Sequence, residues 1–414
     1  MMVPSNCKFN ALKAVVAAAA TASALLAGLP ASLHLQAQAQ TPTPPPSHFF
    51  YLSRGVPAMD DMQNYDGAIM WVRGDDFVVS PQLTLALVYM TGPVGNVRIP
   101  HWHPNSVEMS VVMTGKLRVT TVFTGESETF ELNPGDIFYA PLGYYHYFEK
   151  VSVENVTLMA VFNSATLQSI DQSQLFTQLL VSAPDALSNA FGVPVSVIKS
   201  MFSDPVGTRS VFAVPQPTYT YDPKTNTKQT SCFLFRDLES SLPALPYYPG
   251  SVVRWATGAT HPDLTGTSFA LVTLQPGAWR SPQWCINADE MAFVYSAGLG
   301  QGVEAGVAGA TASERGYLKY LDIMWTPLSW VSWIYNNGTE PVTILFVYNN
   351  AKPKFTSLGE AYTATPPEVL STMHRVPPSF FSQFTKVLST PNIPGLEDVC
   401  AAKVGGKGKG KGKG

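Results

Sequence analysis

The stretch GNVRIPHWHPNSVEMSVVMTG, residues 95–115, decides the fold of this chain. It places His101 two residues before His103, and Glu108 follows five residues later. On a β-strand, residues two apart point to the same side, so both imidazoles can face the interior of a barrel. A second stretch, GDIFYAPLGYYH, ends on His146. We expect Glu108 and His146 to reach that interior from adjacent strands.

The three imidazoles and the carboxylate form a mixed nitrogen and oxygen ligand set. Such a set leaves two positions of an octahedron open for water, substrate or dioxygen, and it suits manganese or iron best, with zinc as an alternative. A single histidine in a tyrosine-rich stretch is usually a hydrogen-bonded core residue, but here the whole spacing is present. We therefore predict one divalent metal ion bound by His101, His103, Glu108 and His146.

The deciding stretch recurs in the second half of the chain as GAWRSPQWCINADEMAFVYSA, residues 277–297. Arg280 falls on Arg98, and Glu290 falls on Glu108. An internal repeat predicts two copies of one structural unit. Each half is expected to be a β-barrel followed by helices, because a segment of helical spacing follows each copy. The two segments are residues 175–191 and 358–384.

The composition favours many short strands. Among 414 residues, 31 are glycine and 34 are proline, spread between runs of valine, threonine, tyrosine and phenylalanine. Glycine and proline mark tight turns, so an all-β fold is expected. Only 13% of the residues are charged and the formal net charge is -3, which argues against nucleic acid as the partner because phosphate binding needs a basic surface.

The two motifs resemble those of the cupin superfamily. They read Gly95-x5-His101-x-His103-x4-Glu108-x6-Gly115 and Gly135-x5-Pro141-x-Gly143-x2-His146. The chain is similar above all to the oxalate decarboxylase family of bicupins, over most of its length. The further shared features are Arg98, the His-Trp-His triplet, Pro276–Arg280 and Asn189–Val193. The resemblance implies a bicupin, an all-β chain with peripheral helices and two cupin (jelly-roll-like) β-barrels.

The resemblance also implies a manganese enzyme that acts on oxalate. In that family the arginine at the position of Arg98 holds a carboxylate of oxalate beside the metal. A guanidinium suits this role because it pairs with a carboxylate through two parallel hydrogen bonds and stays charged when buried. The alternative for Arg98 is a surface arginine whose stem covers apolar neighbours.

A lid after the barrel carries, in decarboxylating members, a glutamate that supplies the proton replacing carbon dioxide. The corresponding stretch here, NSATLQSIDQSQL at residues 163–175, contains no glutamate, and Asp171 is its one acid. Asp171 is therefore the candidate proton donor, provided that it reaches the reacting carbon. The alternative is a solvated loop aspartate. Without a donor, dioxygen would oxidise oxalate to carbon dioxide and hydrogen peroxide, as in an oxalate oxidase.

The second half departs from the motif at the ligand positions. Gln283 and Cys285 replace the two histidines of the triplet, Ser332 stands where the last histidine is expected, and Glu290 alone remains. Neutral amide and hydroxyl oxygens are weak ligands, and a thiolate prefers softer metals than manganese. We predict a structural barrel without a catalytic metal. In the alternative, Cys285 and Glu290 bind zinc or copper.

The N-terminal residues are typical of a secretory signal. Lys8 and Lys13 precede an apolar run at residues 14–29, and Ala37-Gln38-Ala39 has the form of a cleavage site. A membrane anchor is the alternative. The predicted organisation is a signal peptide (1–39), a Pro-rich linker (40–49), a metal-binding cupin barrel with its helical segment (50–206), an inter-barrel connection (207–245), a degenerate cupin barrel (246–395) and a disordered Lys/Gly tail (396–414).

An oxidising compartment would allow disulfides and glycans. Loss of Cys7 with the signal leaves Cys232, Cys285 and Cys400, which permit at most one intramolecular disulfide, and we favour the pair Cys232 and Cys400. Two acceptor sequons for a glycoprotein begin at Asn155 and Asn337.

Together these features predict a secreted manganese-dependent bicupin that converts oxalate to formate and carbon dioxide at the first barrel only, with dioxygen as cofactor or co-substrate. The alternatives are an oxalate oxidase-like enzyme and a non-catalytic metal-binding, ligand-binding or storage bicupin, since fold alone does not fix function. The expected partner is oxalate or a similar small dicarboxylate. Nucleic acid is not expected, nor a membrane after signal removal, and a homo-oligomer is compatible with the fold.

Overall fold

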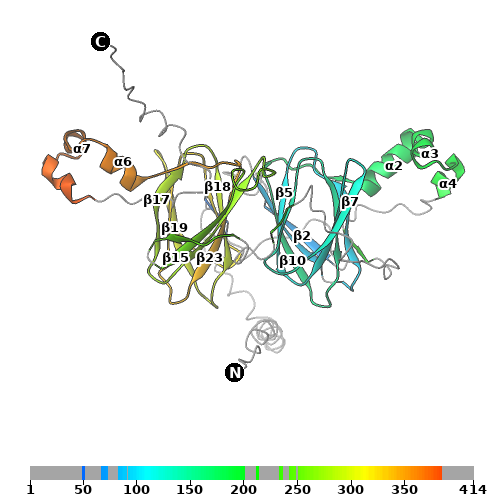
Figure 1. Cartoon of the computed structure of the whole chain (residues 1–414), viewed down its shortest axis with the longest axis horizontal. Helices are drawn as coiled ribbons and strands as arrows, with labels where there is room; N and C mark the ends of the chain where they lie inside the picture. The colour runs from blue at the N-terminus through cyan, green and yellow to red at the C-terminus, as the bar shows by residue number, and fades with distance from the viewer. Residues whose placement is uncertain are drawn as a thin grey trace, which may run out of the picture. The chain divides into compact units, whose positions relative to one another are not determined.

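The computed structural model describes residues 49–51, 67–72, 83–90, 92–200, 211–213, 233–235, 242–248 and 250–384. These residues form two β-barrels, each followed by short helices (Figure 1). The predicted all-β fold with peripheral helices is confirmed. The predicted leader and Lys/Gly tail lie outside the described residues, as do Cys232 and Cys400.

The first barrel consists of two facing antiparallel sheets. One sheet has the order β13-β8-β5-β10-β3-β2, and the other has the order β11-β4-β9-β6-β7, with β12 also paired to β4. Fully buried rings such as Phe138 and Phe148 lie in its core, and each such ring contributes about 1.5–3 kcal/mol through burial. The strands are β2 (Gly67–Val72), β3 (Thr84–Met90), β4 (Asn96–Trp102), β5 (Glu108–Thr114), β6 (Leu117–Phe123), β7 (Glu126–Leu132), β8 (Ile137–Ala140), β9 (Tyr145–Lys150), β10 (Val156–Phe162), β11 (Ile170–Asp171), β12 (Val211–Ala213) and β13 (Phe233–Phe235).

The second barrel repeats this plan. One sheet has the order β1-β21-β18-β23-β16-β15-β14, and the other has the order β20-β19-β22-β17-β24. The strands are β1 (Phe50–Tyr51), β14 (Leu245–Tyr247), β15 (Ser251–Ala256), β16 (Ser268–Leu274), β17 (Trp279–Cys285), β18 (Glu290–Ser296), β19 (Gly302–Ala308), β20 (Ser313–Lys319), β21 (Ile323–Thr326), β22 (Val331–Tyr335), β23 (Val342–Tyr348) and β24 (Phe355–Ser357).

Several central strands are apolar on both faces. β3 reads TLALVYM and β16 reads SFALVTL, and nearly every residue of both is buried. Such runs are typical of strands that are covered on both sides. One face of each strand packs inside its own barrel, and the other face contributes to a single apolar cluster that includes Leu85, Met159, Phe269 and Leu345. This cluster joins the two barrels.

The two barrels also share strands. β1 precedes the first barrel in the chain but pairs with β21 of the second barrel, where Phe50 lies opposite Met324. Conversely, β12 and β13 follow the first barrel's helices and pair back with β4 and β8. We call this arrangement the strand exchange. A strand of two residues has no periodicity, so the sequence gives no indication of it.

Helices follow each barrel, at the segments where helical spacing predicts them (green and orange in Figure 1). Pro184 occupies the first turn of α3, where its missing N–H costs nothing, and Gly192 ends that helix with a φ of 65°. The bounds are α2 (Gln172–Ser182), α3 (Pro184–Phe191), α4 (Val195–Ser200), α6 (Leu358–Ala364), α7 (Pro367–His374) and the 3-10 helix η2 (Pro378–Gln383). Over the described part of the chain, every helix is too short or too polar to cross a bilayer.

Candidate metal centre

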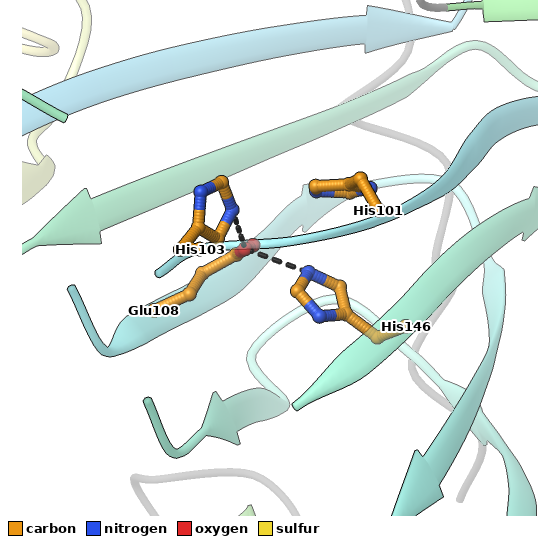
Figure 2. Close-up of side chains that lie close together, drawn as sticks. All are labelled: His101, His103, Glu108 and His146. Carbon is orange, nitrogen blue, oxygen red and sulfur yellow. Dashed lines mark hydrogen bonds and ion pairs between the residues drawn. The ribbon is translucent and has the colours of Figure 1, made fainter. Parts of the chain in front are cut away.

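Four side chains from three strands meet inside the first barrel. His101 lies on β4 and His103 directly after it, Glu108 begins β5, and His146 lies on β9. One ligand atom from each residue lies within 4.8 Å of the others, and all four side chains are buried. Figure 2 shows the rings of His103 and His146 turned toward the Glu108 carboxylate, with His101 beside them. The structure therefore brings together the four residues predicted to bind metal.

A β-bulge in β4 adds a fifth side chain to this interior. Three steps along β4, from Arg98 to His101, face two steps along β9, from Phe148 to His146. Pro100 lies within the bulge, where its missing N–H breaks no ladder hydrogen bond. Residues directly opposite each other in a sheet point to the same face, and Phe148 and His146 share the inner face. The bulge therefore lets Arg98 and His101 face the interior despite their odd spacing.

The outer nitrogens of the three rings define their tautomer. Nδ1 lies 2.7 Å from the carbonyl of Ile99 in His101, 2.9 Å from that of Gln168 in His103 and 2.9 Å from that of Tyr144 in His146. A carbonyl oxygen can only accept, so each Nδ1 carries the hydrogen. In a neutral ring this leaves a lone pair on Nε2, as metal ligation requires.

The inner contacts test whether a cation fits. Oε2 of Glu108 lies 3.1 Å from Nε2 of His103 and 2.8 Å from Nε2 of His146. When both rings are neutral with the hydrogen on Nδ1, these contacts place lone pairs against a carboxylate oxygen, which is repulsive. A cation between them removes the repulsion. The donor set and its geometry therefore fit a bound divalent metal.

The electrostatic environment favours the ligating forms of these groups. Burial, the cationic Arg98 and the neighbouring histidines hold the pKa of His101 well below its usual range. Burial alone would raise the pKa of Glu108, but His146 and His103, which lie against its carboxylate, outweigh this effect and hold the pKa well below its usual range. Neutral imidazoles and an ionised carboxylate are the forms that bind metal.

Ser110 is a supporting residue that sequence reasoning missed. Its hydroxyl donates to Oε1 of Glu108 at 2.5 Å, so that Oε2 is left to face the histidines. Hydrogen bonds of this kind orient metal ligands. The period of two along β5 could have identified Ser110, because it lies two residues after Glu108 and therefore on the same face.

Arg98 and Asp171 form a buried ion pair beside the four ligands. Both terminal guanidinium nitrogens of Arg98 lie 3.3 Å from Oδ1 of Asp171, and each residue is only 5% exposed. Asp171 lies on β11 directly opposite His101. The alternatives of a surface arginine and a solvated loop aspartate are therefore wrong. The structure also adds a feature that the sequence did not predict, namely that the two candidate catalytic residues bind each other.

The segment between β10 and β11 is held over the centre by hydrogen bonds. The side chain of Asn105 accepts from the backbone N–H of Gln168 at 2.9 Å and donates to the carbonyl of Thr166 at 2.8 Å. The carbonyl of Gln168 then accepts from Nδ1 of His103. Asn287 accepts from the backbone N–H of Lys354 in the second barrel in the same way. We call residues 163–171 the strap.

The second barrel has an ion pair where the first barrel has its four ligands. Gln283 lies opposite Ser332 as His101 lies opposite His146, so the predicted correspondence of positions is confirmed. Glu290 forms a buried ion pair with Arg280, and it accepts from Ser332 at 2.9 Å and from Tyr348 at 3.0 Å. Burial opposes the charge of Arg280, but Glu290 outweighs this effect and raises the pKa of the guanidinium.

This pairing disfavours a metal site in the second barrel. Both carboxylate oxygens of Glu290 accept hydrogen bonds, and the thiol of Cys285 lies 3.5 Å from Oδ1 of Asn287. Among the described residues, clustering of three or more histidine, cysteine or acidic side chains that could hold a metal occurs at His101, His103, Glu108 and His146 alone. The arrangement therefore argues against zinc or copper bound by Cys285 and Glu290.

Comparisons with known proteins agree with the fold and the centre. The family model described as Cupin matches residues 71–199 and again residues 248–378. An oxalate decarboxylase of Bacillus subtilis is 28% identical over 121 residues, which are 29% of this chain and 31% of that protein. An oxalate decarboxylase of Arthroderma benhamiae is 25% identical over 253 residues, 55% of this chain and 58% of that protein. The matches thus span less than two thirds of either relative.

Solved structures share the fold. The oxalate decarboxylase of Bacillus subtilis, determined at pH 4.6, superposes with a TM-score of 0.66 at 19% sequence identity, covering 84% of this chain and 88% of that chain. A structure from work on the Mn(II) centres of the same enzyme gives a TM-score of 0.66 at 19% identity, covering 83% and 88% of the two chains. At this identity the likeness shows the fold alone.

Proposed function

Because this chain belongs to the cupin family and carries two cupin domains, we propose that it is an oxalate decarboxylase-like enzyme whose first barrel converts oxalate to formate and carbon dioxide. The observation that carries the proposal is the convergence of His101, His103, Glu108 and His146 beside the guanidinium of Arg98. The oxalate decarboxylases among its relatives support an enzyme of this kind.

Manganese is the proposed metal, with iron or zinc as alternatives. His101, His103 and His146 would hold it through Nε2 and Glu108 through Oε2. When bound, it would supply open coordination positions for oxalate and, with dioxygen, the one-electron chemistry that weakens the carbon–carbon bond. Apolar rings pack against two of the ligands and leave less room for water around them. The ring centroid of Phe162 lies 4.8 Å from that of His103, and the ring centroid of Phe138 lies 5.5 Å from that of His146.

Arg98 is the proposed substrate-orienting residue. Its guanidinium is buried, so a carboxylate that pairs with it is bound in surroundings of low dielectric constant, where ionic hydrogen bonds are strong. Oxalate has two carboxylates, and the one that pairs with Arg98 would lie beside the metal ligands. Monocarboxylates lack the second anchor and should bind more weakly.

Asp171 is the proposed proton donor. Hydrogen oxalate gives formate and carbon dioxide only if a proton reaches the carbon from which carbon dioxide leaves. Asp171 is the acid that the strap places opposite His101. A donor must come within hydrogen-bond reach of the reacting atom, and the pairing of β11 with β4 beside the ligands supports this role for Asp171.

An oxidase is the second candidate, and the ion pair between Asp171 and Arg98 favours it. An aspartate that stays bound to the guanidinium delivers no proton to carbon. Oxalate would then pass two electrons to dioxygen, giving two molecules of carbon dioxide and, with two protons, hydrogen peroxide.

The test is metal analysis of the purified protein followed by an oxalate assay that measures formate and peroxide separately. We expect about one manganese per chain and formate without stoichiometric peroxide. Peroxide without formate would establish the oxidase. Bound metal with neither product would establish a non-catalytic metal-binding or storage role. A His101→Ala, His103→Ala variant is the control, and metal retention by this variant would overturn the assignment of the ligands.

Secretion also belongs to this proposal. The signal-like sequence at residues 1–39 supports it, and both sequon asparagines, Asn155 and Asn337, are exposed and therefore accessible to glycosylation. N-terminal sequencing of protein from the culture medium of a producing cell tests the cleavage near Gln40. An intact leader on cell-associated protein would refute secretion.

A further inference from the structure

Asp171 occupies a position from which it could bind either of two partners. It is the N-cap residue of α2, with an extended backbone of φ -79° and ψ 131°. In the described structure, the side chain of Asp171 makes no hydrogen bond that caps α2. Three donors instead converge on its Oδ1, namely both terminal nitrogens of Arg98 and the hydroxyl of Ser169 at 3.1 Å.

The local sequence nevertheless fits a capped helix. Aspartate is among the preferred N-cap residues, and Gln174 lies three positions later, where a capping box has glutamine or glutamate. The positive end of the helix dipole favours a carboxylate there, and the first turn of α2 contains no acidic residue. The N-terminus of α2 is therefore available to Asp171.

At the equivalent position of the second barrel, the N-cap side chain does cap its helix. Ser357 lies opposite Gln283 as Asp171 lies opposite His101, and both are N-cap residues. The hydroxyl of Ser357 accepts from the backbone N–H of Glu360 at 3.0 Å, and the Glu360 side chain completes a capping box. In that barrel the arginine is paired with Glu290, and the N-cap side chain binds the helix instead.

We propose that Asp171 is a displaceable counter-ion of Arg98. In the absence of substrate it pairs with the guanidinium, and when a substrate carboxylate takes its place on Arg98, the Asp171 carboxylate turns to cap α2 at the N–H groups of Ser173 and Gln174. The buried guanidinium thus has an anionic partner throughout, which avoids the large cost of an unpaired buried charge. This inference rests on the proposed function, because the displacing anion is oxalate. Release from Arg98 also leaves the Asp171 carboxyl able to take the proton of hydrogen oxalate and deliver it to carbon, which it does not do while it is paired with the guanidinium.

This exchange of Asp171 between Arg98 and the N-terminus of α2 makes Asp171 an internal competitor of oxalate. The apparent affinity of a ligand falls by the fraction of protein in which its site is free. Asp171→Asn removes the competing charge, and asparagine is as good an N-cap as aspartate. Asp171→Ala removes both the charge and the cap.

Two measurements test the exchange on manganese-loaded protein kept free of dioxygen. Calorimetric titration with oxalate should show binding about tenfold tighter in Asp171→Asn and Asp171→Ala than in the wild type. Amide hydrogen exchange should show that oxalate slows exchange at Ser173 and Gln174 in the wild type and not in Asp171→Ala. Ser357→Ala is the matched control. It should speed exchange at Glu360 and leave the oxalate affinity unchanged.

Each result decides between the proposals. If the wild type binds oxalate but Asp171→Asn binds it no tighter, or if oxalate leaves exchange at Ser173 and Gln174 unchanged, the exchange is overturned and the proposed function stands. If Asp171→Asn alone binds oxalate, the exchange is supported. If neither protein binds oxalate, the proposed function fails and the exchange fails with it.

Discussion

The hydroxyl of Ser110 donates to Oε1 of Glu108 at 2.5 Å, from the same face of β5. The corresponding residue of the second barrel is Ala292, which lies two residues after Glu290, the glutamate that is paired with Arg280. A ligand that loses its orienting hydrogen bond typically loses 10–100-fold in metal affinity. We expect Ser110→Ala to weaken manganese binding by about 10–100-fold. Competition with a fluorescent chelator measures the affinity.

The control for this prediction is Ser251→Ala, which removes a buried hydroxyl in the second barrel that accepts from the backbone N–H of Gln275. It should leave the manganese affinity unchanged. Equal weakening in both variants would show that general destabilisation, and not ligand orientation, is responsible.

Breaking the Arg280–Glu290 pair should destabilise the second barrel without changing the metal content. Removing one partner of a buried ion pair typically costs about 3–5 kcal/mol because the remaining charge is uncompensated. We therefore expect Glu290→Leu to lower the free energy of unfolding by about that amount, with about one manganese per chain retained. Urea denaturation and elemental analysis provide the two readings.

The double variant Arg280→Met, Glu290→Leu should be more stable than Glu290→Leu alone, because apolar replacement of both partners removes the uncompensated charge. A double variant that is as unstable as the two single losses added together would contradict this account of the pair.

Two glycines of the motif have different structural roles. Gly115 has a φ of 71°, and a Cβ there would lie 2.7 Å from Val156 and 2.8 Å from the carbonyl oxygen of Asn155. Gly143 has a φ of 78°, and a Cβ there would meet no atom within 4 Å. Gly143→Ala should therefore cost only the backbone strain, about 1–2 kcal/mol, whereas Gly115→Ala adds overpacking of about 1–3 kcal/mol. Thermal unfolding of the two variants compares them, and equal losses would refute the distinction.

The thiol of Cys285 should be unreactive in the folded protein. Burial raises its pKa to about 11, so at pH 8 the neutral thiol predominates over the nucleophilic thiolate. We expect a maleimide to label the peptide containing Cys285 slowly in buffer and rapidly in urea, as followed by mass spectrometry. Cys285→Ser is the control for peptide assignment. Rapid labelling of the folded protein would show that the thiol is accessible.

Much of the centre could be predicted from the sequence because its determinants are local. The two-residue spacing of His101 and His103 places both on one face of a strand, and the internal repeat aligns Gln283 and Ser332 with lost ligands. The pairing of Arg98 with Asp171 could not be predicted in this way. It joins residues 73 positions apart, and it depends on where a two-residue strand docks after a long return of the chain.

The β4 bulge illustrates a second limit. Strict alternation would place Arg98 and His101 on opposite faces of β4, yet both face the interior. Prolines at residues 100 and 282 mark the bulge in the two repeats, but a proline in a strand fits an edge position equally well. The two prolines are therefore compatible with a bulge, but the sequence alone does not distinguish a bulge from an edge strand.

The strand exchange has a consequence for how this molecule can be divided. A fragment ending before residue 211 would leave β8 without β13, and a fragment starting at residue 242 would leave β21 without β1. Bare sheet edges recruit other chains, so each isolated half is expected to aggregate when produced alone. Neither repeat is therefore an independent folding unit. A shortened protein built from the first barrel alone would need an added strand that pairs with β8 in place of β13.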